Sequence, residues 1–178
     1  MIELTADFRN RCEKIAAEER RNLGLPGYAP LSGEALAASH GVKIITPNEV
    51  STFSTEMCEV FLIQQKVWGC LMQGPDIDPM ILIHPNQSPT RRQSTLMHEL
   101  AHLLLGHASN DLTSVLTGGN PDKKQEEEAR YLGGCLQIPK TGIQWASQVG
   151  LSFARTMSHF NASKDMVQYR CNMAHIHL

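Results

Sequence analysis

The sequence predicts an α+β fold in which a small, at least partly antiparallel sheet is combined with several helices. Short β-branched and apolar runs, several of them bounded by Gly or Pro, are confined to residues 42–83, which is the pattern of a few neighbouring strands. Before and after this region, apolar residues recur every three to four positions, the period of an amphipathic helix. We therefore expect the chain to begin and end in helices and to carry its strands between them.

Two helices are expected near the start of the chain. Residues 3–22 place apolar side chains at helical spacing among Arg, Glu and Lys, and the Gly and Pro residues of segment 23–27 end the pattern. A shorter helix is expected over residues 32–40, because Ser32 is a good N-cap and Gly41 stands just past the end.

Four strands are expected next. Apolar and β-branched residues dominate them, and two of them flank a turn near Lys66, which indicates an antiparallel hairpin. The strands are expected over residues 42–46, 59–65, 67–73 and 80–83.

Two longer helices and a helical tail complete the predicted fold. Residues 90–107 combine Thr90 as the candidate N-cap with a stripe of leucines. Residues 122–137 begin with an acidic turn, which the positive end of a helix dipole favours, and end before Pro139. Three further helical segments are expected at 143–149, 152–160 and 163–174.

The length of 178 residues is typical of one domain with a small addition. We expect residues 1–140 to form this domain and residues 141–178 to form a C-terminal helical tail packed on it. Within the tail, the two helices joined at residues 161–163 have the appearance of a helix-turn-helix.

Composition excludes several classes of protein. The net charge of −2 argues against a large nucleic-acid-binding surface. The five cysteines are odd in number and include no C-x-x-C pair, which argues against a disulfide scaffold and a Cys-rich zinc site and suits a reducing compartment. The sequence contains no apolar run long enough for a membrane span and no signal peptide. We expect a soluble, cytoplasmic protein with neither membrane nor nucleic acid as its partner.

The segment His98-Glu99-Leu100-Ala101-His102 is an H-E-x-x-H motif inside the predicted helix 90–107. Histidines four residues apart lie on one face of a helix, so both imidazoles can reach one metal ion. Glu99 points about 100° away around the axis. Its carboxylate is therefore expected to lie beside the metal and to act as a general base rather than as a ligand.

A catalytic zinc ion usually has three protein ligands and one open position, so a third ligand must come from elsewhere. His107 is one candidate, but the metzincin pattern places Gly seven and His ten residues after the first His. In this sequence Gly106 and His107 follow His98 by eight and nine residues. His107 is therefore expected to pack or cap at the end of the helix.

The helix predicted over residues 122–137 offers a better third ligand. Its buried face should include Ala129, and Glu126 precedes Ala129 by three residues and shares that face. Glu128 lies about 100° away from Ala129 and is kept as the second choice. The metal ligands predicted from the sequence are thus His98, His102 and Glu126, with zinc as the metal that suits two imidazoles and a carboxylate.

With these residues in hand, the sequence resembles the ImmA/IrrE family of metallopeptidases. That family pairs an H-E-[LI]-[GA]-H helix with a downstream E-x-x-A helix that ends in an aliphatic residue and Pro. The resemblance covers roughly residues 20 to 178. The stretches that carry it are RRQSTLMHELAHLLLGH at 91–107, EEEARYLGGCLQIP at 126–139, ILIHPN at 81–86 and LGLPGYAPLSGEALAASHGVKII at 23–45.

The resemblance implies a zincin-like metallopeptidase domain with an active-site helix, a ligand helix and a helical tail. It implies Zn²⁺ on His98, His102 and a glutamate of the second motif, with Glu99 as the general base that accepts a proton from metal-activated water. Members of the family act on helix-turn-helix transcriptional repressors, often near mobile elements or stress-response genes, so a repressor is the expected protein substrate. The group that stabilises the oxyanion is left open among His84, His159, His175 and His177.

Two positions depart from the family pattern. The family often has Asn or Asp directly after the Ala of the second motif, where this chain has Arg130. If that position orients a metal-bound histidine, the support of the site differs here. Gly133 and Gly134 replace larger residues and are expected to loosen the packing of the ligand helix.

Two other functions compete with peptidase activity. A regulatory module could bind metal and a repressor without turnover, although a purely structural metal site has no need of Glu99. A DNA-binding protein is suggested by the helix-turn-helix appearance of residues 152–174, whose last helix carries Lys164 and Arg170. The net charge of −2 does not favour that function.

Overall fold

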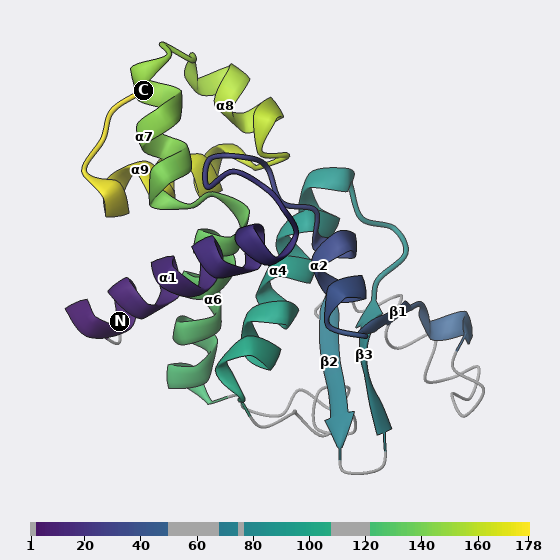
Figure 1. The fold of residues 1–178 in the computed structure, drawn as a ribbon. Coiled ribbons are helices and arrows are strands. Elements are labelled where there is room, and N and C mark those ends of the chain that lie inside the picture. The colour runs from purple at the N-terminus through teal and green to yellow at the C-terminus, as the bar shows by residue number, and fades with distance from the viewer. Residues whose placement is uncertain (1–2, 50–67, 75–76, 108–121) are drawn as a thin grey trace.

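The computed structural model describes residues 3–49, 68–74, 77–107 and 122–178 (Figure 1). The strand predicted over residues 59–65 lies outside the described residues. The described elements follow the predicted order of two helices, a sheet, two longer helices and a helical tail. The α+β class is therefore as predicted.

Within the described residues, the sheet is small and mixed. Its strands are β1 (Lys43–Ile45), β2 (Gly69–Gly74) and β3 (Ile77–Ile83). The central strand β3 runs parallel to β1 and antiparallel to β2, so the spatial order is β1-β3-β2. This arrangement leaves β2 at the edge of the described sheet, on the side where α4 packs.

The strand β3 begins earlier than predicted and contains Pro79. The predicted strand is the apolar run 80–83, which Pro79 bounds, and a proline within a strand cannot donate a hydrogen bond to its neighbour. In the structure, the register between β2 and β3 shifts between Met72 and Gly74, which is the stretch of β2 that faces Pro79. A strand tolerates proline at such an irregularity because the ladder is already interrupted there.

The long helix α4 occupies the centre of the molecule. The four helices that surround or follow the sheet are α1 (Ala6–Asn22), α2 (Gly33–Ser39), α4 (Pro89–Leu105) and α6 (Lys123–Gln137). Helix α4 packs on β2 and β3, on α2 and on α6, and α1 packs on α6 (Figure 1). Polar side chains on α4 that face the sheet and α6 are therefore held by contacts on both sides.

The helix starts are set by capping side chains. Ser32 caps α2, as predicted, by accepting a hydrogen bond from the backbone N–H of Ala35. The prediction of Thr90 as the cap of α4 is wrong, because Ser88 accepts from the N–H of Arg91 and Pro89 takes the first helical position. Proline is well suited to that position, since its missing N–H has no partner in the helix.

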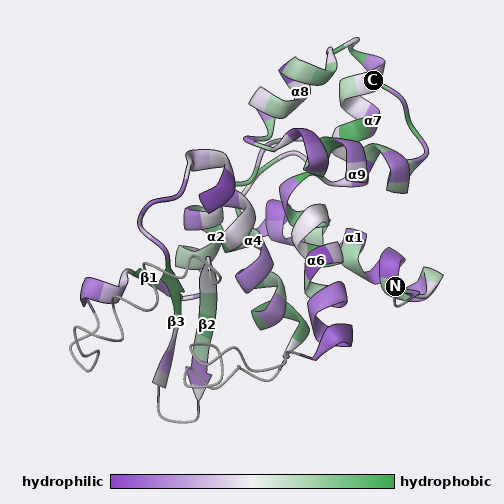
Figure 2. Ribbon diagram, turned by 180° about the vertical axis from the view of Figure 1, so that it is seen from behind, coloured by the Kyte–Doolittle hydropathy of each residue, from purple (hydrophilic) through white to green (hydrophobic). Residues whose placement is uncertain are grey.

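The core contains two groups of buried apolar side chains. The larger group joins α1, α2, α4, α6 and the sheet, and the smaller group lies among the tail helices. The C-terminal end of β3 is strongly hydrophobic (Figure 2), and its residues Ile81, Leu82 and Ile83 are fully buried. Among the described residues, no helix is both long enough and apolar enough to cross a membrane.

The tail consists of α7 (Lys140–Gln148), α8 (Phe153–His159) and α9 (Lys164–Ala174), at the end of the molecule away from the sheet (Figure 1). Helix α7 starts three residues before the predicted segment, and Gly142 lies in this added turn. A Cβ on Gly142 would lie 2.8 Å from Phe160 Cζ, so this glycine permits close packing of α7 against Phe160.

Candidate metal centre

Helix α4 presents two imidazoles toward α6. His98 and His102 are one turn apart, with ring centroids 4.8 Å apart and 3.2 Å between their Nε2 atoms. The His102 side chain is 9% exposed and that of His98 is 31% exposed, so His98 forms the solvent side of the pair.

Helix α6 brings Glu126 to the same point. Its carboxylate lies 3.2 Å from His98 Nε2 through Oε2 and 3.4 Å from His102 Nε2 through Oε1. Asp122 caps α6 by accepting from the N–H groups of Lys124 and Gln125, which fixes the turn that carries Glu126. We call His98, His102 and Glu126 the donor triad.

The spacing of the donor triad fits a tetrahedral metal ion. A zinc ion with bonds of about 2.1 Å keeps its ligand atoms roughly 3.4 Å apart. With one ligand atom taken from each residue, the donors lie within 4.8 Å of one another. The two Nε2 atoms are 3.2 Å apart, and they lie 3.2 and 3.4 Å from different oxygens of Glu126. Two neutral imidazoles and one carboxylate are a donor set that zinc favours.

The charges of the triad also favour a bound cation. The neighbouring imidazoles of His102 and His98 hold the pKa of Glu126 far below its ordinary value, so this carboxylate is ionised. Burial lowers the pKa of His98, but the hydrogen bond to Glu126 and the charges of Glu99 and Glu126 outweigh burial and raise it. The site therefore concentrates negative potential where a cation would sit.

Glu99 lies beside the triad, against strand β2. Its Oε2 accepts a hydrogen bond of 2.9 Å from the backbone N–H of Leu71. Burial is the largest influence on this carboxyl group and raises its pKa, despite the lowering effect of His98, His102 and the Leu71 amide. A carboxyl group with a raised pKa is a better proton acceptor near neutral pH than an ordinary glutamate.

Sequence reasoning missed the contribution of β2 to this carboxylate. A Cβ on Gly69 would lie 2.5 Å from Thr95 Cγ2 and 3.3 Å from Glu99 Oε1, so only glycine lets the strand approach α4 this closely. A glycine inside a predicted strand is the signal that could have indicated the close approach.

Glu128, the second choice for the third ligand, lies elsewhere. Its Oε2 is 3.2 Å from Nε2 of His107, and its Oε1 is 3.8 Å from Lys124 Nζ. His107 follows Gly106, the left-handed C-cap of α4, and its ring stands 2.9 Å from His102 through the two Nδ1 atoms. Burial lowers the pKa of His107, and the nearby His102 acts in the same direction. His107 thus packs at the helix end, as expected, but directly on a triad histidine.

The residues that depart from the family pattern make different contacts in the structure. Arg130 pairs with Glu127 and stacks over the ring of Tyr169, 4.7 Å from its centroid. The expected loosening at Gly133 is wrong, because a Cβ there would lie 3.1 to 3.2 Å from the backbone of Met97 and His98. Gly133 brings α6 close to α4 at the turn that carries the triad.

The remaining histidines occupy other surroundings. His84 packs against Trp68, with centroids 5.4 Å apart, and its Nδ1 accepts from the N–H of Asn86. His159 packs on Trp145 in the tail, where His175 is the C-cap of α9 and His177 lies near the C-terminus. In the tail helix α9, Arg170 is buried and bonded to Glu13, which removes from solvent the arginine that the DNA-binding alternative requires.

Comparison with known proteins identifies the family. The peptidase M78 family model, described as the IrrE N-terminal-like domain, matches residues 38–172. The chain belongs to this family. The resemblance to the ImmA/IrrE metallopeptidases is thereby confirmed, and the triad and the H-E-x-x-H helix both lie inside the matched region of this peptidase M78 chain.

Among solved structures, the peptidase M78 chain is similar to a Mycobacterium tuberculosis transcriptional regulator, with a TM-score of 0.54 and 14% sequence identity. The similarity covers 94% of this chain and 47% of that protein, so the chain spans about half the length of the regulator. At this identity the similarity shows the fold alone. None of the curated proteins matches this sequence.

Proposed function

We propose that this peptidase M78 chain is a zinc-dependent endopeptidase that hydrolyses peptide bonds with Glu99 as general base. The observation that carries the proposal is the donor triad, whose ligand atoms lie within 4.8 Å of one another, with Glu99 directly after His98 on the same helix. Membership of a metallopeptidase family supports it.

Each residue has a separate part in the reaction. His98, His102 and Glu126 would hold the ion, which when bound supplies Lewis acidity toward a water molecule and the peptide carbonyl. Glu99 accepts a proton from the attacking water and transfers it to the leaving amine. The hydrogen bond from Leu71 to Oε2 of Glu99 fixes the carboxylate and leaves Oε1 to take the proton.

The proposed substrate is a helix-turn-helix transcriptional repressor in the cytoplasm, encoded near this gene or on a mobile element. Two observations support a regulatory role: the family resemblance carried by the two motif helices, and a fold shared with a protein described as a transcriptional regulator. Endoproteolysis of a repressor would release its target genes in a single irreversible step.

The Glu99→Gln variant tests the mechanism. It should bind one zinc ion per chain with unchanged affinity and lose cleavage of the repressor by about 10²–10⁴-fold, because the amide cannot accept the proton. Metal analysis and gel-based cleavage at catalytic ratios measure the two properties. Glu127→Gln, on α6 and paired with Arg130, is the matched control and should keep both.

Three results would contradict the proposal. Full cleavage by Glu99→Gln removes the proposed base. Tight, stoichiometric binding of the repressor by the zinc-loaded wild type, with no cleavage, would instead indicate a metal-binding regulatory module. His98→Ala and Glu126→Ala should lose zinc, and retention of zinc by either would place the metal elsewhere.

A further inference from the structure

Behind the donor triad, three side chains form a continuous hydrogen-bonded chain. Nδ1 of His102 lies 2.9 Å from Nδ1 of His107, and Nε2 of His107 lies 3.2 Å from Oε2 of Glu128. The side chains of His102, His107 and Glu128 are 9%, 7% and 18% exposed, so little water competes for these contacts. We call this chain the His102–His107–Glu128 relay.

The order of donors and acceptors in the relay follows from its last member. An ionised carboxylate only accepts, so Glu128 receives the N–H of His107 Nε2. A neutral His107 then has a lone pair on Nδ1, which accepts the N–H of His102 Nδ1. His102 is left with its lone pair on Nε2, the atom that stands 3.4 Å from Glu126 and 3.2 Å from His98 Nε2.

The relay is held in place by backbone contacts as well. The N–H of His107 donates to the carbonyl of His102 across the left-handed Gly106, and the side chain of Gln73 on β2 donates to the carbonyl of His107 at 3.0 Å. Glu128 comes from α6, the helix that also supplies Glu126. His107 is thus held by α4, by β2 and by α6, through its backbone and its ring.

We propose that His107 and Glu128 are positioning residues that fix His102 as the tautomer protonated on Nδ1 and orient its Nε2 toward the metal. This inference rests on the proposed zinc-binding function of the triad. Carboxylates that fix a ligand histidine in this way are known to influence metal affinity strongly, and here a second imidazole stands between the two groups.

Variants at position 107 distinguish the hydrogen-bonding role of the His107 ring from its role in filling space. His107→Leu removes the acceptor and should weaken zinc binding by about 10- to 100-fold, measured by competition with a chelator of known affinity. His107→Asn keeps an acceptor close to the place of Nδ1 and should restore most of the affinity. Equal losses in the two variants would show that the ring acts only by filling space.

The tautomer gives a readout that needs no metal. Long-range ¹H–¹⁵N spectra of the metal-free wild type should show His102 protonated on Nδ1. In His107→Leu, a substantial fraction of the molecules should instead carry this proton on Nε2. A wild-type His102 protonated mainly on Nε2 would overturn the inference, whatever the zinc affinity.

Glu128→Gln tests the other end of the relay and avoids a change in the core. The amide can also donate, so the direction of the relay is no longer fixed, and zinc affinity should fall about tenfold or more. Glu127→Gln is the matched control with no contact to the relay and should bind like wild type. Unchanged affinity in both Glu128→Gln and His107→Leu would sink the inference. If the wild type does not bind zinc, the proposed function fails, and the metal-free spectra still decide the tautomer.

Discussion

At the scale of single residues, His98 and His102 are equivalent in the sequence motif but not in the structure. His102 is almost enclosed and has a partner on each ring nitrogen, whereas His98 forms the exposed side of the triad. The glutamates of α6 diverge in the same way. Glu126 faces the histidines, Glu127 pairs with Arg130, and Glu128 supports His107.

The titration of His98 in the metal-free protein tests the electrostatics of the triad. Because Glu126 and Glu99 outweigh the effect of burial, the pKa of His98 should lie above the ordinary histidine value. In Glu126→Gln this pKa should fall, since the partner that favours the imidazolium is gone. NMR titration of the ring protons measures both values, and an unchanged pKa in the variant would contradict the assigned contact.

The raised pKa of His98 also affects metal binding. Zinc binds the neutral imidazole, so acid competes with the metal over the range in which His98 becomes protonated. The affinity of the wild type should therefore be constant above the pKa of His98 and fall as pH drops through it. Chelator competition between pH 5 and 8 measures this dependence.

At the scale of helices and strands, the site depends on how closely α6 approaches α4. Gly133 faces the backbone of Met97 and His98, and Gly134 faces side chains of α9. The two neighbouring glycines thus serve different contacts. The first sets the distance across the donor triad, and the second allows the tail helix to pack on α6.

Alanine at each glycine separates the two contacts. Gly133→Ala should push α6 away from α4, destabilise the metal-free protein by about 1–3 kcal/mol and weaken zinc binding, because the neighbouring atoms are rigid backbone. Gly134→Ala meets side chains only, with Arg170 Cδ at 3.3 Å, Tyr169 Cε1 at 3.4 Å and Met166 Sδ at 3.6 Å, so a small shift suffices, and the helix gains propensity.

The control Gly134→Ala should therefore change stability by less than about 1 kcal/mol and leave zinc affinity intact. Denaturant unfolding and chelator competition give the two quantities. A Gly133→Ala protein with wild-type zinc affinity would show that the contact between α6 and α4 does not limit the site.

At the scale of the whole molecule, two buried arginines connect its ends. Arg20 on α1 donates to the carbonyls of Ala16, Ala29 and Leu136. Arg170 on α9 donates to the carbonyl of Ile138 and pairs with Glu13 on α1. Both arginines thus bond to the chain where α6 ends and the tail begins, so the tail is fixed to the body by polar contacts as well as by apolar packing.

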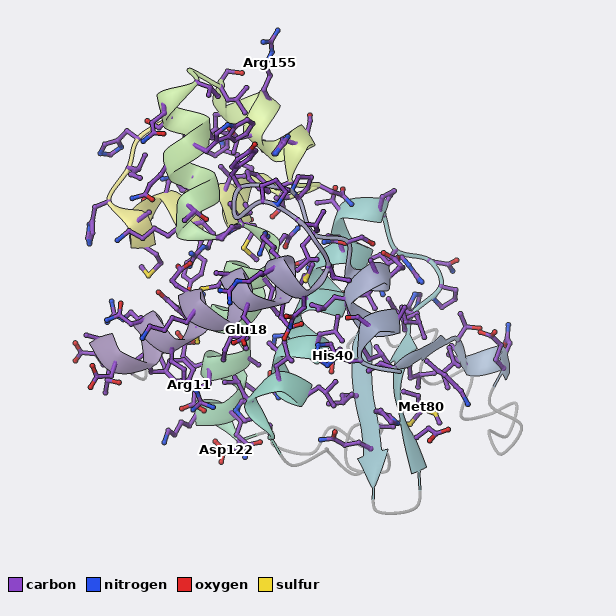
Figure 3. All side chains as sticks on the ribbon, in the orientation of Figure 1. Arg11, Glu18, His40, Met80, Asp122 and Arg155 are labelled. Carbon is purple, nitrogen blue, oxygen red and sulfur yellow. The ribbon has the colours of Figure 1, made fainter. Side chains whose placement is uncertain are left out.

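Removal of Arg170 should destabilise the whole fold. Arg170→Ala leaves Glu13 without its partner and the Ile138 carbonyl without a donor, and we expect a loss of about 3 kcal/mol. Arg155→Ala is the control, because Figure 3 shows Arg155 extending into solvent at the far end of the tail, opposite the Asp122 end of α6. The control should change stability by less than about 0.5 kcal/mol. Equal stabilities of the two variants in thermal unfolding would contradict this assignment.

The sequence alone determined the features that depend on neighbours along the chain. The period of apolar residues predicted the order of helices and the α+β class, and the spacing of His98 and His102 placed both on one face of a helix because helix geometry fixes their separation. The preference for Glu126 over Glu128 followed from the same periodicity, and the structure brings Glu126 to the histidines.

Contacts between separate elements were decided only by the tertiary structure. The amide of Leu71 on Glu99, the relay through His107 to Glu128 and the close approach at Gly133 all join side chains or backbone from different elements. Local patterns do not specify the partners in these contacts, because the partners depend on the distance and rotation at which packed helices and strands meet. The residue types determine which chemistry is available, whereas the packing of α4, α6 and β2 determines which of these groups come into contact.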